Sequence, residues 1–395
     1  MADNFQTTSP RTVLFAGGGS GGHLYPGLAV AERLRERRPD LVPLFLCTER
    51  DIDRVILEPS GFEFIPQPIT PPTRSVGGLL RFWSRWRATN ELVRKVLAER
   101  NPAAVLGLGG YAAGVAVKVA ADKKFGVPAG ILNPDVVPGK ANLYLMQFSL
   151  KIFCGTDATL DHIPAEHRDK CEVSGCPLRS ALLAPPPRED AFERLGLDSR
   201  LNTLVVTGAS QGARTVNEAV VEVISRMSAD SPKETARAGL QGWQVLHLAG
   251  RELAEDVRAD WRRTPLSGRA KVIDFTPAMA DVWAVADLAV ARSGASTCAE
   301  LLAFGVPAVL MPYPFHKDMH QRANAKDLEA QGAAVVIDDT KNRKTNADAL
   351  RPTLEALLYN AEQRRAMATA AKAAARPDAA DSVATFLSEM AGDPA

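Results

Sequence analysis

The sequence predicts an α/β protein built from two doubly wound domains. In both halves of the chain, short apolar runs typical of buried strands alternate with segments typical of helices, which is the order found in parallel sheets covered by helices. A glycine-rich turn joins the first strand to the first helix of each half. The 395 residues, of which 46% are hydrophobic, are enough for two cores of ordinary size.

The expected elements follow the same order in each half. In the first half we expect strands at residues 13–16, 41–47, 103–108 and 128–132, and helices near residues 28–36, 51–57, 115–123 and 141–148. In the second half we expect strands at residues 202–207, 243–248, 271–274, 288–291 and 306–311, and helices at residues 215–227, 296–304 and 366–375.

The prolines at 185–187 indicate the domain boundary, because proline fixes φ and suits neither a helix nor a central strand. We expect a first domain over residues 1–183, a second over 188–375, and a C-terminal helix within 376–395 that crosses back to the first domain. Ligands of such sheets bind at the carboxyl ends of the strands. Two domains of this kind therefore predict a cleft between them.

Composition excludes several classes of protein. A net charge of +1 gives no global attraction for nucleic acid. The five cysteines form no Cys-x-x-Cys pair, which fits buried thiols in a reducing cytoplasm, and Cys171 and Cys176 lack the partners of a zinc site. The N-terminus is unlike a signal peptide, and no apolar run approaches the roughly 20 residues that span a bilayer. We therefore expect a soluble or peripheral protein.

The most informative motif is Gly-Gly-Gly-Ser-Gly-Gly-His, from Gly17 to His23. Because glycine has no Cβ, this turn can expose backbone N–H groups beside the positive end of the next helix, which favours a phosphate or a developing negative charge. His23 adds a titratable group. The alternatives are a structural turn and a dinucleotide-binding fingerprint with Glu49 or Asp51 as its acidic residue, whereas the missing lysine excludes a P-loop.

Three further loops follow strands in the second half. Residues 208–213 form a second glycine loop, and residues 291–300 lead into a helix that carries Glu300, whose carboxylate could accept hydrogen bonds from both hydroxyls of a ribose. Residues 312–325 offer polar groups for sugar hydroxyls. Taken singly, these segments have structural alternatives: a turn, a helix cap and a solvated loop.

Residues 74–100 combine aromatic and basic side chains in one predicted helix. Exposed rings at headgroup depth, with cations on the phosphates, favour an anionic lipid surface. The alternative is an amphipathic helix packed on its own sheet. The side chains expected at the membrane are Leu79, Arg81, Phe82, Trp83, Arg85 and Trp86.

In this order, the motifs resemble the MurG family (glycosyltransferase family 28). The segments that carry the resemblance are Gly-Gly-Ser-Gly-Gly-His with Pro-Gly-Leu-Ala, Gly-Gly-Tyr, Ser-Gln-Gly-Ala, Arg-Ser-Gly-Ala with Glu, and His-Lys-Asp with Gln and Asn-Ala. The resemblance implies a glycosyltransferase-B (GT-B) fold with an interdomain cleft, in a peripheral enzyme on the cytoplasmic face of the inner membrane. It implies transfer of N-acetylglucosamine from UDP-N-acetylglucosamine to lipid I (undecaprenyl-diphospho-muramoyl-pentapeptide), giving lipid II for the bacterial cell wall.

The resemblance also implies the roles of individual residues. The second domain would bind most of the donor, with Thr276 beside the uracil and Glu300 on the ribose. The residues implied at the donor are Ser20, Gly21, Gly22, Arg179, Ser210, Gln211, Gly212, Thr276, Ser293, Gly294, Ala295, Ser296, Thr297, Glu300, His320 and Gln321. Those implied at the acceptor diphosphate are Gly18, Gly19, Gly109, Gly110 and Tyr111.

Two positions depart from the family pattern. Leu132-Asn133-Pro134-Asp135 replaces the family's His-Glu-Gln-Asn, and His320 stands where the family has glutamine. We expect an inverting transfer in which the acceptor hydroxyl attacks the anomeric carbon while UDP leaves. His23 is the first candidate for the general base, because imidazole titrates near neutrality, and Asp135 is the second.

We expect loop amides and helix ends, rather than a metal or other cofactor, to stabilise the leaving group. Three alternatives stay open: a family glycosyltransferase with another lipid acceptor such as diacylglycerol, an epimerase of UDP-N-acetylglucosamine, and a non-catalytic subunit that binds the sugar nucleotide.

Overall fold

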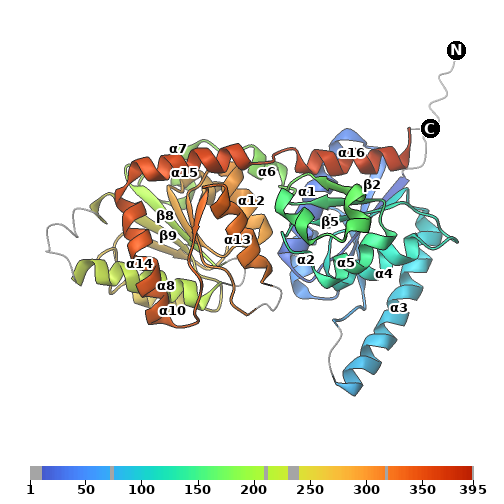
Figure 1. Ribbon diagram of the computed structural model, residues 1–395, viewed down its shortest axis with the longest axis horizontal. Coiled ribbons are helices and arrows are strands. Elements are labelled where there is room, and N and C mark those ends of the chain that lie inside the picture. The colour runs from blue at the N-terminus through green and yellow to red at the C-terminus, as the bar shows by residue number, and fades with distance from the viewer. Residues whose placement is uncertain (1–10, 72–74, 209–211, 230–239, 316–318, 394–395) are drawn as a thin grey trace, which may run out of the picture. The chain divides into compact units, whose positions relative to one another are not determined.

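The chain divides into two units, one with residues 1–180 and 377–395 and the other with residues 181–376. A computed structural model describes residues 11–71, 75–208, 212–229, 240–315 and 319–393 (Figure 1). The chain leaves the first unit just before the prolines at 185–187 and returns to it at Pro377.

The first unit is a parallel sheet with helices on both faces. Within the described residues the sheet has seven strands in the order β3-β2-β1-β4-β5-β6-β7. They are β1 (Arg11–Ala16), β2 (Leu41–Thr48), β3 (Glu63–Gln67), β4 (Ala104–Gly107), β5 (Ala129–Asn133), β6 (Lys151–Cys154) and β7 (Cys171–Val173). The helices α1 (Gly21–Arg37), α2 (Asp51–Leu57) and α16 (Ala379–Ala391) pack on one face, and α3 (Val76–Arg100), α4 (Gly110–Ala120) and α5 (Lys140–Leu145) on the other.

The strands β1, β2, β4 and β5 were predicted, whereas β3, β6 and β7 were not. The unpredicted strands are short or only partly buried, so no long apolar run marks them. Helix α1 begins at Gly21 rather than near residue 28, and α4 begins at Gly110 rather than residue 115. Glycine has a low helix propensity, so packing of the two helices on the sheet sets these starting points. Gly21, Gly22 and His23 therefore form the first turn of α1 and are not part of a loop.

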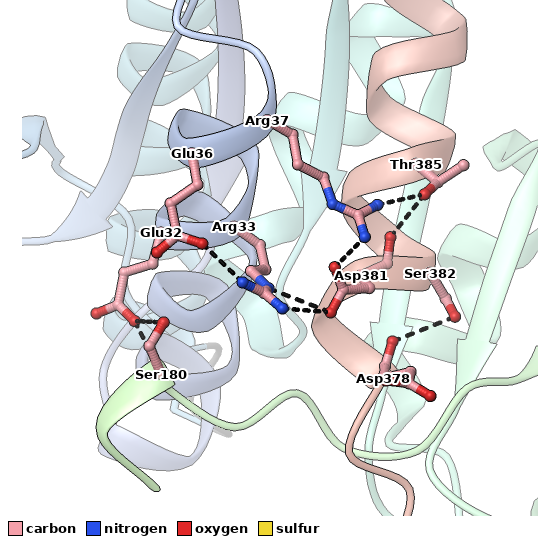
Figure 2. Close-up of polar contacts among 9 residues, drawn as sticks. All are labelled: Glu32, Arg33, Glu36, Arg37, Ser180, Asp378, Asp381, Ser382 and Thr385. Carbon is pink, nitrogen blue, oxygen red and sulfur yellow. Dashed lines mark hydrogen bonds and ion pairs between the residues drawn. The ribbon is translucent and has the colours of Figure 1, made fainter. Parts of the chain in front are cut away.

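Helix α16 completes the core of the first unit. Its Val383, Ala384 and Leu387 are fully buried, and it lies beside α1 (Figure 2). Arg33 of α1 binds Asp381 of α16 at 3.1 Å, and Arg37 also pairs with Asp381. The C-terminal segment is therefore an integral part of the first unit.

Helix α1 also holds the point at which the chain leaves this unit. One carboxylate oxygen of Glu32 accepts hydrogen bonds from the backbone N–H of Ser180 at 3.1 Å and from its hydroxyl at 3.3 Å (Figure 2). Ser180 is the first residue of the short helix α6 (Ser180–Leu183). Helix α1, which starts at the glycine loop, therefore binds Ser180, where the chain leaves the first unit. It also binds α16, which forms after the chain has returned.

The second unit repeats the architecture. Within the described residues its parallel sheet has the order β10-β9-β8-β11-β12-β13. The strands are β8 (Asn202–Thr207), β9 (Trp243–Leu248), β10 (Ala270–Ile273), β11 (Leu288–Ala291), β12 (Ala308–Leu310) and β13 (Ala334–Val336). The helices are α7 (Arg188–Leu195), α8 (Arg214–Ala229), α10 (Ala254–Trp261), α11 (Met279–Val285), α12 (Ala295–Phe304), α13 (His320–Ala330), α14 (Arg343–Tyr359) and α15 (Ala361–Ala374).

The strand orders place the predicted loops at the switch point of each sheet. In the first unit the order reverses between the neighbouring strands β1 and β4, and in the second between β8 and β11. The loops that follow these four strands carry the glycine motifs. Ligands of open parallel sheets bind at these points, because the connections on either side run to opposite faces and leave a crevice.

Candidate functional site

A buried carboxylate holds the first glycine loop. Asp53 of α2 is fully buried and accepts hydrogen bonds from the backbone N–H of Gly19, at 2.7 and 2.9 Å to its two oxygens. It also accepts from the backbone N–H of Thr48 at 2.8 Å and from the Thr48 hydroxyl at 2.7 Å. A Cβ at Gly18, whose φ is +157°, would collide with the same carboxylate.

This contact corrects two expectations. The acidic residue that reaches the glycine loop from beyond the second strand is Asp53, and neither Glu49 nor Asp51 makes this contact. The N–H of Gly19 already donates to a carboxylate, so this amide is not the open phosphate ligand that the sequence predicted. The first turn of α1, at Gly21 and Gly22, offers N–H groups at this loop, because no side chain caps the helix.

His23 is held in a defined orientation beside the loop. Its Nδ1 lies 3.2 Å from the Ser20 hydroxyl oxygen and 3.2 Å from the Gly18 carbonyl oxygen. A carbonyl oxygen can only accept, so the proton of the neutral ring is assigned to Nδ1 and Nε2 keeps its lone pair. This is the tautomer that a general base requires.

The imidazole ring packs on the loop after β4. A Cβ built on Gly109 would lie 3.2 Å from the His23 ring, and one on Gly110 would lie 2.9 Å from it. Both glycines have positive φ, +99° and +70°. Glycine is needed at both positions because a side chain would displace the imidazole and would be strained.

Arg50 and Tyr111 complete this cluster. Arg50 donates to the Gly19 carbonyl at 2.6 Å, and the Tyr111 hydroxyl lies near the same glycine. Burial raises the pKa of Tyr111, and Asp53 raises it further, while Arg50 acts in the opposite direction. Tyr111 is therefore a neutral hydroxyl at neutral pH, able to donate to an anion.

Asp135 lies just beyond the end of β5, and β5 pairs with β4. Its backbone carbonyl accepts from the Asn133 side chain at 2.8 Å, and Asn133 in turn accepts from Asn142 at 3.0 Å. Asn142 also donates to the Leu132 carbonyl at 2.9 Å, which fixes the orientation of its amide. The segment that departs from the family pattern is thus anchored by two asparagines, and Asp135 itself is half-buried.

In the second unit a buried ion pair joins the loops at the switch point. Arg292 and Asp339 pair at 2.8 Å with side-chain exposures of 5% and 0%. Arg292 also donates to the carbonyls of Met311 and Pro312, at 2.7 and 3.0 Å, and to the Thr215 hydroxyl at 2.8 Å. Burial favours the neutral form of Asp339, but its hydrogen bonds, led by that from Thr215, lower its pKa overall.

The N-terminus of α12 is directed at this switch point. Gly294 is its N-cap, no side chain caps the helix, and Ala295, Ser296 and Thr297 form its first turn. The Ser293 hydroxyl donates to the Gln321 carbonyl at 2.7 Å, and Gln321 Oε1 accepts from the Tyr313 N–H at 2.9 Å. Ser293 therefore joins the loop after β11 to the first turn of α13, and the Gln321 side-chain amide is oriented with its carbonyl toward the Tyr313 backbone. The uncapped amides of α12 can bind an anion.

Glu300 lies in the second turn of α12. Its Oε2 accepts a hydrogen bond from the indole N–H of Trp283 at 2.6 Å. Thr276 lies beyond β10, and its hydroxyl oxygen accepts from the Ala278 N–H at 3.1 Å. Gly212 has a φ of +76°, and a Cβ there would collide with the backbone of Ala249. Ser210 and Gln211 lie outside the described residues.

Comparison with known proteins identifies the family. A model of the glycosyltransferase family 28 N-terminal domain matches residues 13–154, and one of the C-terminal domain matches residues 203–383. A curated relative from Desulfitobacterium hafniense (strain Y51) is 33% identical over 393 residues, covering 96% of this chain and 99% of the relative. The chain belongs to glycosyltransferase family 28.

The relative is named UDP-N-acetylglucosamine--N-acetylmuramyl-(pentapeptide) pyrophosphoryl-undecaprenol N-acetylglucosamine transferase. A family 28 protein of the same name from Halorhodospira halophila (strain DSM 244 / SL1) is 36% identical, covering 97% of this chain and 99% of that protein. The crystal structure of Acinetobacter baumannii MurG is similar in fold, with a TM-score of 0.69 and 24% identity over 96% of this chain and 99% of that one. The prediction of two Rossmann-like units in a GT-B fold is confirmed.

Helix α3 of this family 28 chain has two different halves. Towards its C-terminal end Val93, Val96 and Leu97 are buried against the sheet. Towards its N-terminal end, which extends away from the rest of its unit (Figure 1), Leu79, Leu80 and Trp83 are 44%, 69% and 63% exposed. The N-terminal end of α3 is thus exposed, and its C-terminal end belongs to the core of the unit.

Two of the six side chains expected at the membrane contact other elements of the first unit. Trp86 is half-buried and would contact a Cβ on Gly114 of α4, so it packs on its own unit. Arg85 pairs with Glu49 at 3.2 Å. Phe82 is half-buried, with its ring centroid 5.8 Å from those of both Trp83 and Trp86.

In the described residues, two features related to membranes and metals are absent. Over these residues, no helix of the family 28 chain combines the length and apolar character needed to span a bilayer. The same residues bring together no group of three or more His, Cys, Asp or Glu side chains suited to a metal. Of the two aspartates in the first turn of α2, Asp51 is exposed and Asp53 binds the glycine loop.

Sequence reasoning missed four residues that shape the site: Asp53, Asn142, Trp283 and Arg292. Asp53 had a signal, an acidic residue in the first turn of the helix after the second strand. Arg292 is the first residue of the Arg-Ser-Gly-Ala motif, but an arginine is usually exposed, so its burial was not predictable. Trp283 and Asn142 had no signal, because each meets its partner only through the packing of separate elements.

Proposed function

We propose that this protein transfers N-acetylglucosamine from UDP-N-acetylglucosamine to the muramoyl-pentapeptide carried on undecaprenyl diphosphate. The observation that carries the proposal is the identity of 33% and 36%, over nearly full length, with relatives named for this transfer. Family 28 domain models match residues in both units, which supports a complete enzyme rather than a binding subunit.

We assign the nucleotide sugar to the second unit. The uncapped N-terminus of α12, at Ala295, Ser296 and Thr297, offers N–H groups and the positive end of a helix dipole to the diphosphate. Glu300 is one turn further along the same helix and suits the ribose hydroxyls. Negative charge that develops on the leaving UDP is stabilised by these fixed dipoles, without a metal.

We assign the acceptor and the base to the first unit. The acceptor hydroxyl attacks the anomeric carbon, the bond to the UDP oxygen breaks with inversion, and the hydroxyl proton passes to Nε2 of His23. The contacts of Nδ1 with Gly18 and Ser20 keep the lone pair on Nε2 and support this role. Asp135 is the second candidate, because it stands where the family motif is replaced.

We also propose that the protein is peripheral on the cytoplasmic face of the inner membrane. The exposed Leu79, Leu80 and Trp83 at the free end of α3, together with exposed Arg81, support docking on anionic lipid.

The activity is tested with radiolabelled UDP-N-acetylglucosamine and the purified chain. Separate reactions contain a lipid I analogue, diacylglycerol or no lipid. We expect label in the lipid product, one UDP released per transfer, and the same rate in EDTA. Label transferred only to diacylglycerol would identify a different acceptor. Isomerisation of the nucleotide sugar without lipid would identify an epimerase, and no reaction in any arm would contradict the proposal.

The base is tested with His23→Ala. Loss of a general base lowers kcat by about 10²- to 10⁴-fold, whereas His162→Ala, at an exposed histidine of the same unit, leaves kcat unchanged. Near-parental turnover in folded His23→Ala protein, with a large loss in Asp135→Asn, would transfer the role to Asp135.

A further inference from the structure

The contact between Trp283 and Glu300 has no counterpart in the sequence motifs. The indole N–H of Trp283 points at Glu300 Oε2 from 2.6 Å, and Trp283 is only 2% exposed. A hydrogen bond to an ionised group at this length is among the stronger ones in proteins. A carboxylate can accept about four hydrogen bonds, so this one orients the group without exhausting its capacity.

Helix α11, which carries Trp283, is itself fixed on α7. Arg194 forms two hydrogen bonds with Asp281, at 2.7 and 3.1 Å. Arg188 donates to both oxygens of Asp287 at 2.9 and 2.8 Å, and to the Ala284 carbonyl at 3.0 Å. These contacts lie on both sides of Trp283 in the sequence. The buried indole therefore offers its N–H from a fixed position.

We propose that Trp283 is a positioning residue that sets the orientation of the Glu300 carboxylate for a ribose diol, and so determines selectivity for ribonucleotides over 2′-deoxyribonucleotides. The inference rests on the proposed function, because it takes Glu300 as the group that binds the ribose. Glutamate has three side-chain torsions, so a carboxylate that has lost this hydrogen bond samples more directions and loses part of its preference for one hydroxyl arrangement.

The test measures binding of UDP and 2′-deoxy-UDP to the full chain by isothermal titration calorimetry. The quantity of interest is the ratio of the two dissociation constants, since a general weakening of the site changes both constants but not their ratio. For the parent we expect a ratio of about ten or more, as for one hydrogen bond to a charged group. For Trp283→Phe we expect a ratio near one.

Trp261→Phe is the matched control. Trp261 is a buried tryptophan of the same unit, 1% exposed, and its indole N–H donates to His247 Nδ1 at 2.9 Å. The substitution also removes a buried indole N–H and its hydrogen bond, but it does not touch Glu300. We expect this variant to keep the parental ratio. A parental ratio in Trp283→Phe would overturn the positioning role.

The outcomes separate this inference from the proposed function. A parent that binds neither nucleotide contradicts the donor assignment, whereas a parent that binds both equally contradicts ribose selectivity alone. If Trp283→Phe does not fold, the indole resonances of the parent decide. We expect UDP to shift the Trp283 N–H signal more than 2′-deoxy-UDP does and to leave that of Trp261 in place. Equal shifts with both nucleotides, or none, would overturn the proposal.

Discussion

Replacing Asp53 with asparagine tests whether a buried carboxylate holds the glycine loop. Both oxygens of Asp53 act as acceptors, one for the Gly19 N–H at 2.7 Å and the other for Gly19 and for both donors of Thr48. An amide has only one acceptor oxygen, so its NH₂ group would face a backbone N–H. One charge-assisted bond is lost and one buried donor is left unpaired, which together cost about 2–4 kcal/mol of the free energy of unfolding.

The assay is urea denaturation at pH 7, with Asp51→Asn as the control. Asp51 is two residues away on the same helix but exposed, so its substitution changes the net charge equally. We expect the control to stay within about 0.5 kcal/mol of the parent. The reasoning is refuted if Asp53→Asn also does so, because the four bonds would then contribute nothing to folding.

Three further predictions concern other parts of the molecule. Arg292→Met leaves the buried Asp339 without its cation and should lower the free energy of unfolding by about 3–5 kcal/mol; parental stability in urea would contradict this. Burial lowers the pKa of His247 from 6.5 to about 3, so the unfolded chain binds a proton that the folded chain does not. Stability should therefore fall as pH drops from 6.5 towards 3, by up to about 1.4 kcal/mol per pH unit, and His247→Gln should remove this part of the slope; an unchanged slope would contradict it. Replacing both Leu80 and Trp83 with serine should weaken sedimentation with anionic vesicles more than tenfold, since each exposed side chain can bury about 1.5–3 kcal/mol of apolar surface; undiminished sedimentation would exclude this end of α3 as the contact.

Most of the strands that the sequence predicted have continuous apolar runs. β1, β2, β8 and β9 lie inside their sheets and are buried almost throughout, so their sequences are continuously hydrophobic. β7 and β13 are three-residue strands at the edges, half-buried, and their sequences resemble those of loops. Burial on both faces thus explains why most central strands were predictable. There are two exceptions: β6 lies inside its sheet but has only four residues and was not predicted, whereas the edge strand β10 was predicted.

The candidate site also has a part that was predictable from the sequence and a part that was not. Its backbone components were predictable, because a glycine turn between a buried strand and a helix has few conformations and lies at the carboxyl edge of the sheet. Its side-chain partners were not. Gly19 was expected to donate to a ligand, but it donates to Asp53, which is 34 residues away in the sequence.

From residue order alone, this chain was predicted to be two Rossmann-like units with glycine-containing loops at the carboxyl ends of their strands, since local propensity and burial period act over a few residues. Only the tertiary structure decided which groups those loops contact: Asp53 on Gly19, Trp283 on Glu300, and Arg292 on Asp339. Each of these bonds depends on how separate elements pack, and a hydrogen bond forms or fails over a few tenths of an ångström, a precision that no sequence pattern carries.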